Sequence, residues 1–134
     1  MKKIRAAIVG YGNIGKYVLE ALQASPDFEI AGVIRRNVTD VPDELKDYPV
    51  AGTLDGLKDV AVAILCTPTR KVEEFAEKAL SRGINTVDSF DIHTEIAGLR
   101  SRLNTIAKKY NSVAVTSAGW DPGSDSVIRA LLEA

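Results

Sequence analysis

The sequence predicts an α/β fold in which a doubly wound parallel sheet carries helices on both faces. Three observations predict it. A strand-like apolar run, 6–9, leads into a Gly-x-Gly-x-x-Gly turn at 10–15, and helical spacing of apolar residues begins directly after the turn. Along the rest of the chain, short apolar runs alternate with further stretches of helical spacing. This alternation favours right-handed crossovers between parallel strands.

The glycine turn has the spacing with which Rossmann folds bind a dinucleotide. We expect Gly10 to turn the chain, Gly12 to let the backbone approach a pyrophosphate, and Gly15 to let the helix lie close to the strand. The helix would direct its free N–H groups and the positive end of its dipole at the phosphates. The alternative is a loop that merely needs glycines. The strand before the turn and the helix after it favour the dinucleotide.

A second strand is predicted over 28–34, and the residues that follow it indicate which dinucleotide is bound. In Rossmann folds, an acidic residue at this strand end binds the ribose 2'-hydroxyl of NAD. This chain has Arg35 and Arg36 instead, and two guanidinium groups suit the 2'-phosphate of NADP. The alternative is a solvated pair of surface charges. We therefore expect NADP as the cofactor.

The middle of the chain is first polar and then strongly apolar. We expect a surface excursion over 37–49, a short strand near Val50 and one helical turn within 53–57. The apolar run 60–65 predicts a central strand that is buried on both faces. Ligands of open parallel sheets bind at the carboxyl ends of strands, so the residues after this run should line the cofactor cleft: Cys66, Thr67, Pro68 and Thr69. For Cys66, a small buried hydrophobe is favoured over a reactive thiol.

The second half of the chain continues the alternation. The spacing predicts a helix over 71–82, a strand over 84–87, a helix over 94–110, a strand over 113–116 and a helix over 124–133. Gly83 suits the end of the first of these helices, because glycine readily adopts the left-handed conformation that ends many helices.

Polar clusters follow the last two predicted strands. Both clusters should lie at the sheet edge that carries the glycine turn, which places Asp91 and Asp121 near a bound nicotinamide, where they suit a substrate amino group. Each carboxylate could instead cap the helix that follows it, and His93 is favoured as a surface residue of a first helical turn. Trp120 suits a substrate wall as well as a core anchor.

The composition excludes several classes of function. The 134 residues are 46% hydrophobic and 26% charged, which is typical of one soluble globular domain. The formal net charge is −1 and the charges are interspersed, so the chain lacks the basic field that nucleic acid or an anionic membrane needs. No apolar run approaches the ~20 residues of a membrane span. One cysteine and one histidine cannot form an intrachain disulfide or a structural zinc site. We expect a cytoplasmic protein without a metal, nucleic-acid or membrane partner.

Four stretches together resemble the N-terminal half of the meso-diaminopimelate dehydrogenases. They are Val9-Gly10-Tyr11-Gly12-Asn13-Ile14-Gly15, the pair Arg35-Arg36, Thr86-Val87-Asp88-Ser89-Phe90-Asp91-Ile92-His93, and Ser117-Ala118-Gly119-Trp120-Asp121-Pro122-Gly123. The resemblance covers essentially the whole chain, and its Gly-Trp-Asp-Pro-Gly segment is specific where the glycine motif is not. It implies NADP-dependent oxidative deamination of meso-2,6-diaminopimelate at its D-centre, reversible as reductive amination in the lysine and peptidoglycan pathway, by a homodimer.

The resemblance also implies roles for individual residues. Asp91 and Asp121 would receive the reacting amino group, with Trp120 and Gly123 shaping the substrate pocket. Implied contacts with the cofactor come from the glycine turn, the arginine pair and three loops: Gly10, Tyr11, Gly12, Asn13, Ile14, Gly15, Arg35, Arg36, Cys66, Thr67, Pro68, Thr69, Phe90, Asp91, His93 and Pro122.

This sequence departs from the family in length. Members of the family continue through a substrate-binding and dimerisation domain, whereas this sequence ends at Ala134. We therefore expect the 134 residues to be a nucleotide-binding half that binds NADP(H) without turning over diaminopimelate. The alternatives are another oxidoreductase on the same fold, similar to glucose-fructose oxidoreductase and the Gfo/Idh/MocA enzymes or to dihydrodipicolinate reductase, a non-catalytic NAD(P)-binding sensor, and a purely structural domain.

Overall fold

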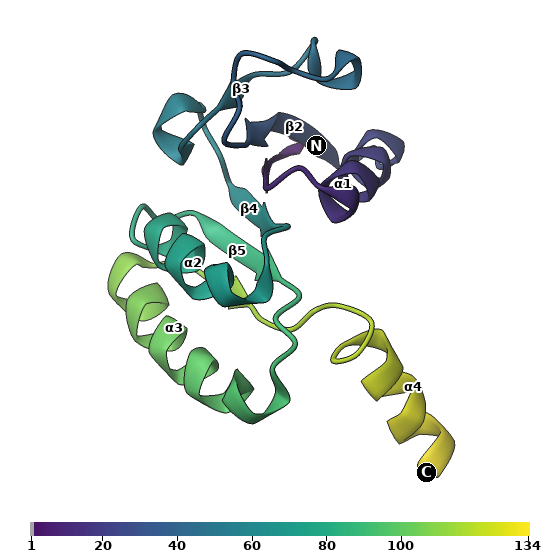
Figure 1. The fold of residues 1–134 in the computed structure, drawn as a ribbon. Helices are drawn as coiled ribbons and strands as arrows, with labels where there is room; N and C mark the ends of the chain where they lie inside the picture. Colours follow the sequence, from purple (N-terminus) through teal and green to yellow (C-terminus); the bar gives the residue numbers. More distant parts are fainter. Residues whose placement is uncertain (1) are drawn as a thin grey trace. The chain divides into compact units, whose positions relative to one another are not determined.

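The computed structural model describes residues 2–134, which form two compact units. The N-terminal unit extends to Thr67, and the C-terminal unit runs from Pro68 to Ala134. In both units the helices alternate with strands, and the strand pairs within each unit are parallel (Figure 1).

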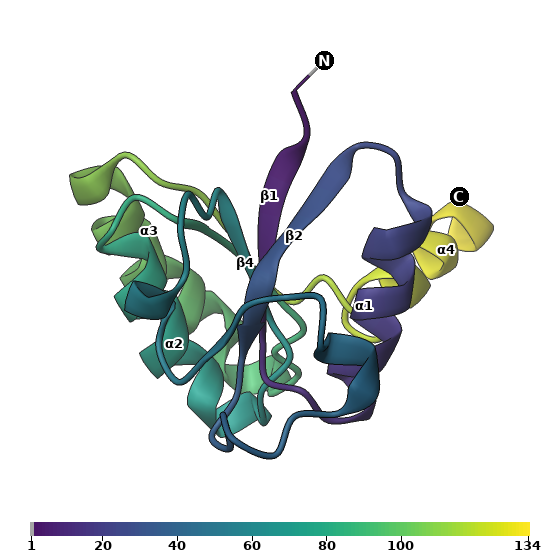
Figure 2. The same ribbon diagram turned by 90° about the horizontal axis from the view of Figure 1, so that it is seen from above.

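The N-terminal unit is a parallel sheet with the strand order β3-β2-β1-β4. Its elements are β1 (Ile4–Val9), α1 (Asn13–Ala24), β2 (Phe28–Ile34), β3 (Val50–Ala51) and β4 (Val62–Leu65). The helix α1 lies beside β1 and β2 (Figure 2). It packs there because Leu19 and Leu22 form one apolar stripe, which joins Ala6, Ile8 and Val33 in a buried core. The register of β1 and β2 shifts between Ala6 and Ala7.

The polar segment 37–49 contributes to this core, which its composition does not predict. Its 3-10 turn, η1 (Asp43–Leu45), inserts Leu45 into the core with none of the side chain exposed. A second 3-10 turn, η2 (Leu54–Gly56), lies within the predicted helical turn at 53–57. The expectation of a surface excursion over 37–49 is therefore wrong at Leu45, because this side chain packs into a core formed by residues of β1, α1 and β2, which are distant in the sequence.

The C-terminal unit packs helices against the parallel pair β5 and β6. Its elements are η3 (Thr69–Lys71), α2 (Val72–Leu80), β5 (Asn85–Asp88), η4 (His93–Glu95), α3 (Ile96–Tyr110), β6 (Ala114–Val115) and α4 (Ser124–Glu133). The helices α2 and α3 lie side by side (Figure 1). Their buried faces include Val72, Ala76, Leu80, Leu99 and Leu103. By contrast, the apolar side chains of α4 are exposed, with Leu131 at 72% and Leu132 at 81%.

Most predicted elements occur where the sequence places them. The bounds of β2 and α4 match the predictions, and Gly83 has φ +75° and donates to the carbonyl of Leu80 just after α2. The strand predicted over 60–65 is shorter, because it begins only at Val62, after Asp59 takes a left-handed conformation with φ 53°. Within β4, Ala63 and Leu65 are buried while Val62 and Ile64 are half-buried, so burial on both faces is only partly reached.

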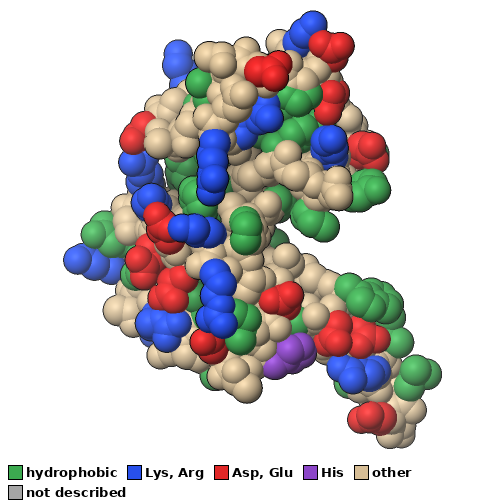
Figure 3. Space-filling view, in the orientation of Figure 1, with side chains coloured by type: hydrophobic (Ala, Val, Ile, Leu, Met, Phe, Trp, Pro, Cys, Tyr) green, Lys and Arg blue, Asp and Glu red, His purple; other side chains and the backbone are tan. Residues whose placement is uncertain are grey.

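The helices and one face of the surface have the following character. None of the helices in residues 2–134 is long and apolar enough to cross a membrane. On the face shown in Figure 3, acidic and basic side chains are interspersed in both units.

Candidate functional site

The turn after β1 is so tight that the fold itself requires two of its glycines. Gly10 has φ +96°, and a Cβ there would lie 2.5 Å from the carbonyl oxygen of Cys66. A Cβ at Gly15 would collide with the carbonyl oxygen of Gly10. A Cβ at Gly12, however, would meet none of the described atoms within 4 Å. The fold has no need of a glycine at position 12, whereas a pyrophosphate that approaches the backbone does need one.

The first turn of α1 presents backbone N–H groups beside this glycine. The N–H of Lys16 donates to the carbonyl of Gly12 at 3.1 Å, so the N–H groups of Asn13, Ile14 and Gly15 precede the first intrahelical bond. Within residues 2–134, no side chain caps the helix, and its first turn holds no acidic residue. The free N–H groups and the positive end of the helix dipole therefore suit an anionic group.

The two arginines after β2 differ in their surroundings. Arg35 is half-buried, and its Nη1 donates to the carbonyl of Asp40 at 2.8 Å. The same loop is closed by the Asn37 side chain, whose Oδ1 accepts from the N–H of Thr39 at 3.0 Å and from the N–H of Asp40 at 2.9 Å. Arg36 is exposed. Arg35 is thus held against the loop, whereas the charge of Arg36 is directed at solvent, where it is available to a phosphate.

A hydrogen bond joins the glycine turn to the segment after Arg36. The hydroxyl of Tyr11 donates to Oε1 of Glu44 at 3.0 Å, and the ring packs against the core. Partial burial, followed by this bond to Glu44, raises the pKa of Tyr11 to about 12. The contact spans 33 residues, so no local pattern in the sequence indicates it.

The end of β4 brings Cys66 and Thr67 next to the glycine turn. The N–H of Cys66 donates to the carbonyl of Val9 at 2.7 Å. Burial raises the pKa of the Cys66 thiol to about 11, so the thiol is protonated at neutral pH and acts as a packing residue, as the sequence favours. The hydroxyl of Thr67 is buried and has no hydrogen-bond partner in the described part of the chain. Such a hydroxyl is suited to a ligand group.

In the C-terminal unit, the loops after β5 and β6 carry the two candidate carboxylates. Oδ1 of Asp91 accepts a hydrogen bond from the hydroxyl of Thr69 at 2.7 Å. Oδ1 of Asp121 lies 3.9 Å from Nε2 of His93 and 3.7 Å from Nη2 of Arg129. Neither carboxylate caps the helix that follows it. Asp91 makes no capping hydrogen bond to η4 or α3, and Asp121 makes none to α4. The capping alternative is therefore wrong for both.

The aromatic residues of these loops have opposite environments. Trp120 is 67% exposed, which removes the core-anchor alternative, whereas Phe90 is buried. The loop of Trp120 is compact because Gly119 donates to the carbonyl of Pro122 at 3.1 Å. Gly123 has φ +144°, and a Cβ there would collide with the carbonyl oxygen of Gly119. An exposed indole on a compact loop is well suited to be the wall of a binding pocket.

The candidate residues thus fall into one group in each unit. The turn, Arg35, Arg36, Cys66 and Thr67 follow the carboxyl ends of β1, β2 and β4. The second group comprises Pro68 and Thr69 at the start of its unit, and residues that follow β5 and β6: Phe90, Asp91, His93, Trp120, Asp121, Pro122 and Gly123. Glu44 and Asp88 were not among the predicted site residues. For Asp88, an acidic residue at the end of a short strand was the available signal.

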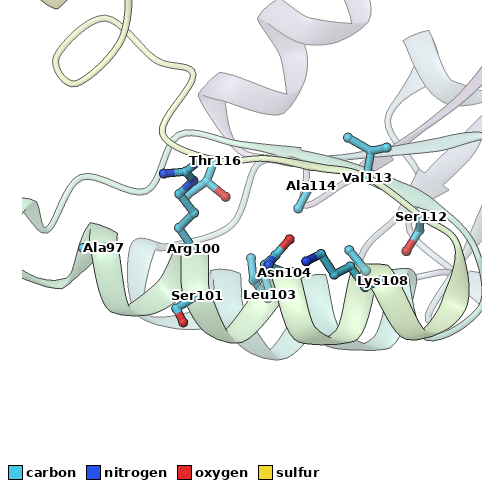
Figure 4. Close-up of a pocket in the computed structure, with 11 residues that line it drawn as sticks. Ala97, Arg100, Ser101, Leu103, Asn104, Lys108, Ser112, Val113, Ala114 and Thr116 are labelled. Carbon is cyan, nitrogen blue, oxygen red and sulfur yellow. The ribbon is translucent and has the colours of Figure 1, made fainter.

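Two cavities lie apart from most of these residues. A cavity of about 550 Å³ between α3 and β6 is lined by none of the candidate residues (Figure 4). Arg100, Asn104 and Lys108 project from α3 along it. A second cavity, of about 380 Å³, includes Thr69 and Phe90. Its charged side chains pair with one another; for example, the guanidinium of Arg102 donates to Glu73 at 2.7 and 2.9 Å and lowers the pKa of that carboxyl. No cluster of three or more metal-ligating side chains occurs among residues 2–134.

Comparison with known proteins extends these observations. A family model described as an oxidoreductase family with an NAD-binding Rossmann fold, GFO_IDH_MocA, matches residues 4–117. The meso-diaminopimelate D-dehydrogenase of Bacteroides fragilis is 64% identical over 135 residues, covering 100% of this chain and 45% of that protein. The enzyme of the same name from Corynebacterium glutamicum is 34% identical, covering 96% of this chain and 40% of that protein. The chain thus spans less than half the length of these relatives.

Solved structures agree with the sequence relatives. An engineered D-amino acid dehydrogenase bound to NADP+ matches with a TM-score of 0.84 at 35% identity, covering 97% of this chain and 40% of the other. The Corynebacterium glutamicum diaminopimelate dehydrogenase in complex with diaminopimelate matches with a TM-score of 0.82 at 34% identity, covering 98% and 41%. The predicted α/β fold of the Rossmann type and the resemblance stated from the sequence are confirmed.

Proposed function

This chain belongs to the oxidoreductase family with an NAD-binding Rossmann fold, and we propose that it is the cofactor-binding part of an NADP-dependent meso-diaminopimelate D-dehydrogenase. The observation that carries the proposal is the similarity to the Bacteroides fragilis enzyme, which extends over the whole chain. The aligned region spans both the general glycine turn and the more specific loop that contains Trp120 and Asp121. A likeness limited to the glycine turn would support only nucleotide binding.

Several features of the N-terminal unit support NADP(H) as the cofactor. The open space at Gly12 and the N–H groups at the start of α1 fit a pyrophosphate, and the buried hydroxyl of Thr67 has no hydrogen-bond partner in the described part of the chain. Arg36 would bind the 2'-phosphate, and Arg35 would hold the loop beside it. Bound NADP+ supplies the acceptor for the hydride that leaves the D-configured carbon, and water hydrolyses the resulting imine to a ketone and ammonia.

The residues of the C-terminal unit would bind and orient the substrate. Asp91 and Asp121 would accept hydrogen bonds from the reacting ammonium group, since carboxylates are the acceptors that pair best with it. As the amine loses a proton before the hydride leaves, a carboxylate within hydrogen-bond reach would receive that proton. Thr69 would hold Asp91 in one orientation through its 2.7 Å hydrogen bond. Trp120 would close one side of the substrate pocket.

The proposal also covers the location, the oligomeric state and the substrate class of the enzyme. We propose that the enzyme works in the cytoplasm as a homodimer, with a small amino acid as its substrate and a role in lysine biosynthesis. Size-exclusion chromatography with light scattering on the full-length protein tests the dimer, and a mass that corresponds to one subunit would contradict it.

Steady-state kinetics on the full-length protein test the proposed activity. We expect NADP+ reduction with meso-diaminopimelate and none with the LL isomer, which lacks a D-centre. Asp121→Asn should lower kcat/KM for the meso isomer by about 100-fold or more, since it removes the negative charge that pairs with the ammonium group. Absence of NADPH formation with meso-diaminopimelate, or reduction driven by a sugar, would contradict the proposal.

A further inference from the structure

Asp88 is a buried charged residue at the point where β5 ends. It is 2% exposed, and it is the last residue of the strand, so the loop that carries Asp91 begins directly after it. Oδ2 of Asp88 has no hydrogen-bond partner among the described residues. A buried carboxylate costs free energy that its hydrogen bonds must offset, so its contacts with the rest of the protein are informative.

The backbone and side chain of Asp88 bind two separate loops. We call residues 89–92 the β5 loop and residues 116–123 the β6 loop. Oδ1 of Asp88 accepts from the N–H of Phe90 at 3.0 Å and from the N–H of Ser117 at 2.9 Å. The carbonyl of Asp88 accepts from the N–H of Ala118 at 2.8 Å. One residue therefore fixes the starts of both loops.

The backbone of the β6 loop is shaped to make this contact. Ser117 has φ 61°, a left-handed conformation that is unfavourable for residues other than glycine. That conformation occurs where the N–H of Ser117 reaches Oδ1 of Asp88. Farther along, the loops pack directly on each other, since a Cβ at Gly119 would lie 3.2 Å from the Cβ of Ser89. Just after the β5 loop, Nε2 of His93 lies 3.9 Å from Oδ1 of Asp121 in the β6 loop.

From this geometry we propose that Asp88 is a positioning residue, which sets the spacing between Asp91 and Asp121 by holding the β5 and β6 loops together. The inference rests on the proposed function, in which both carboxylates bind the reacting amino group. Asp88 itself is buried and reaches the reaction only through these loops. Its effect should therefore fall on turnover and substrate binding, while the nucleotide contacts of the N-terminal unit remain.

The first test compares variants of the full-length enzyme. Asp88→Ala removes both side-chain bonds and should lower kcat/KM for meso-diaminopimelate by roughly 100-fold, because small displacements of reacting groups have effects of this size. The affinity for NADPH should fall far less than kcat/KM does, because the nucleotide contacts of the N-terminal unit remain. Asp88→Asn keeps an acceptor oxygen and should restore most of the activity. Thr86→Val is the matched control, since the Thr86 hydroxyl is equally buried on the same strand and has no partner in the described region.

A double-mutant cycle separates positioning from a general structural role. If Asp88 acts by placing Asp121, Asp88→Ala should lower kcat/KM by no more than about threefold when Asp121 is already Asn. Gly119→Ala provides a second perturbation, because its Cβ would press on Ser89 and shift the same loop without touching Asp88. It should lower kcat/KM with NADPH affinity unchanged, and it decides the question if Asp88→Ala does not fold.

Hydrogen exchange keeps the inference testable apart from activity. The amides of Phe90 and Ser117 should exchange faster in Asp88→Ala than in the wild type. In Thr86→Val their exchange rates should equal those of the wild type. An inactive wild type would refute the proposed function, and exchange at these two amides would still decide the role of Asp88. Equal exchange in Asp88→Ala, full activity of the folded variant, or fully additive losses in the cycle would overturn the inference.

Discussion

Substitution of Gly12 by alanine separates the demands of the fold from those of the ligand. A Cβ at this position meets no described atom within 4 Å, and the backbone there, with φ −93° and ψ −152°, is open to alanine. Stability should therefore be unchanged or rise by about 0.4–1 kcal/mol, because alanine restricts the unfolded chain. In the proposed complex, the added methyl group occupies space that a pyrophosphate oxygen needs to reach the N–H groups of α1.

The expected loss of affinity follows from those N–H groups. Displacing the pyrophosphate from one or two charge-assisted hydrogen bonds costs about 3 kcal/mol. This corresponds to roughly a 100-fold weaker binding of NADPH. Calorimetric titration measures the affinity, and thermal unfolding measures the stability of the same sample. Gly52→Ala is the matched control, because its Cβ also meets nothing described within 4 Å but lies outside the turn, so it should leave the affinity for NADPH unchanged and change stability no more than Gly12→Ala does. A Gly12→Ala variant that binds NADPH like the wild type would refute the reasoning.

Three further predictions concern the same unit. Arg36→Ala should weaken NADPH binding by at least about tenfold and leave NADH binding unchanged, since a charged hydrogen bond is worth about 1.5–3 kcal/mol. Titration of the variant with both nucleotides measures this, and equal losses of affinity for both would contradict the role of Arg36. Alkylation of Cys66 at neutral pH should be about 100-fold slower than alkylation of a thiol with the ordinary pKa of 9.0, because a pKa of about 11 leaves less thiolate. The alkylation rate of Cys66 should rise as the pH approaches 11. Leu45→Ala should lower the free energy of unfolding by about 2–5 kcal/mol in urea, whereas Val38→Ala, at a side chain that is 45% exposed, should change it little; equal effects would show that Leu45 is not a core residue.

The sequence predicts those parts of the molecule whose signal is local. The glycine turn combines three glycines with the strand before them and the helix after them within residues 4–24, so its geometry follows from neighbours in the chain. The helix α4 and the strand β2 are recognised for the same reason, since each has a clear period of its own. The end of α2 at Gly83 follows from the conformational freedom of one residue.

The contacts that define the candidate site depend instead on residues far apart in the chain. Tyr11 and Glu44 are separated by 33 positions, and Asp88 and Ser117 by 29. Periodicity indicates which face of an element is buried, but not which side chain of a distant loop will meet it. The burial of Leu45 has the same origin, because its core partners belong to β1, α1 and β2. Such positions become predictable only when the packing of neighbouring elements is known.

The central claim is that the turn after β1 binds NADP(H), with the arginines after β2 selecting its extra phosphate. Calorimetric titration of the full-length protein with NADP+ and with NAD+ tests it most directly. The two ligands differ only in the 2'-phosphate, so the ratio of their affinities measures what Arg35 and Arg36 contribute. We predict that NADP+ binds at least about tenfold more tightly than NAD+. Equal affinities would contradict the selection by the arginines, and absence of binding by either nucleotide would contradict the site itself.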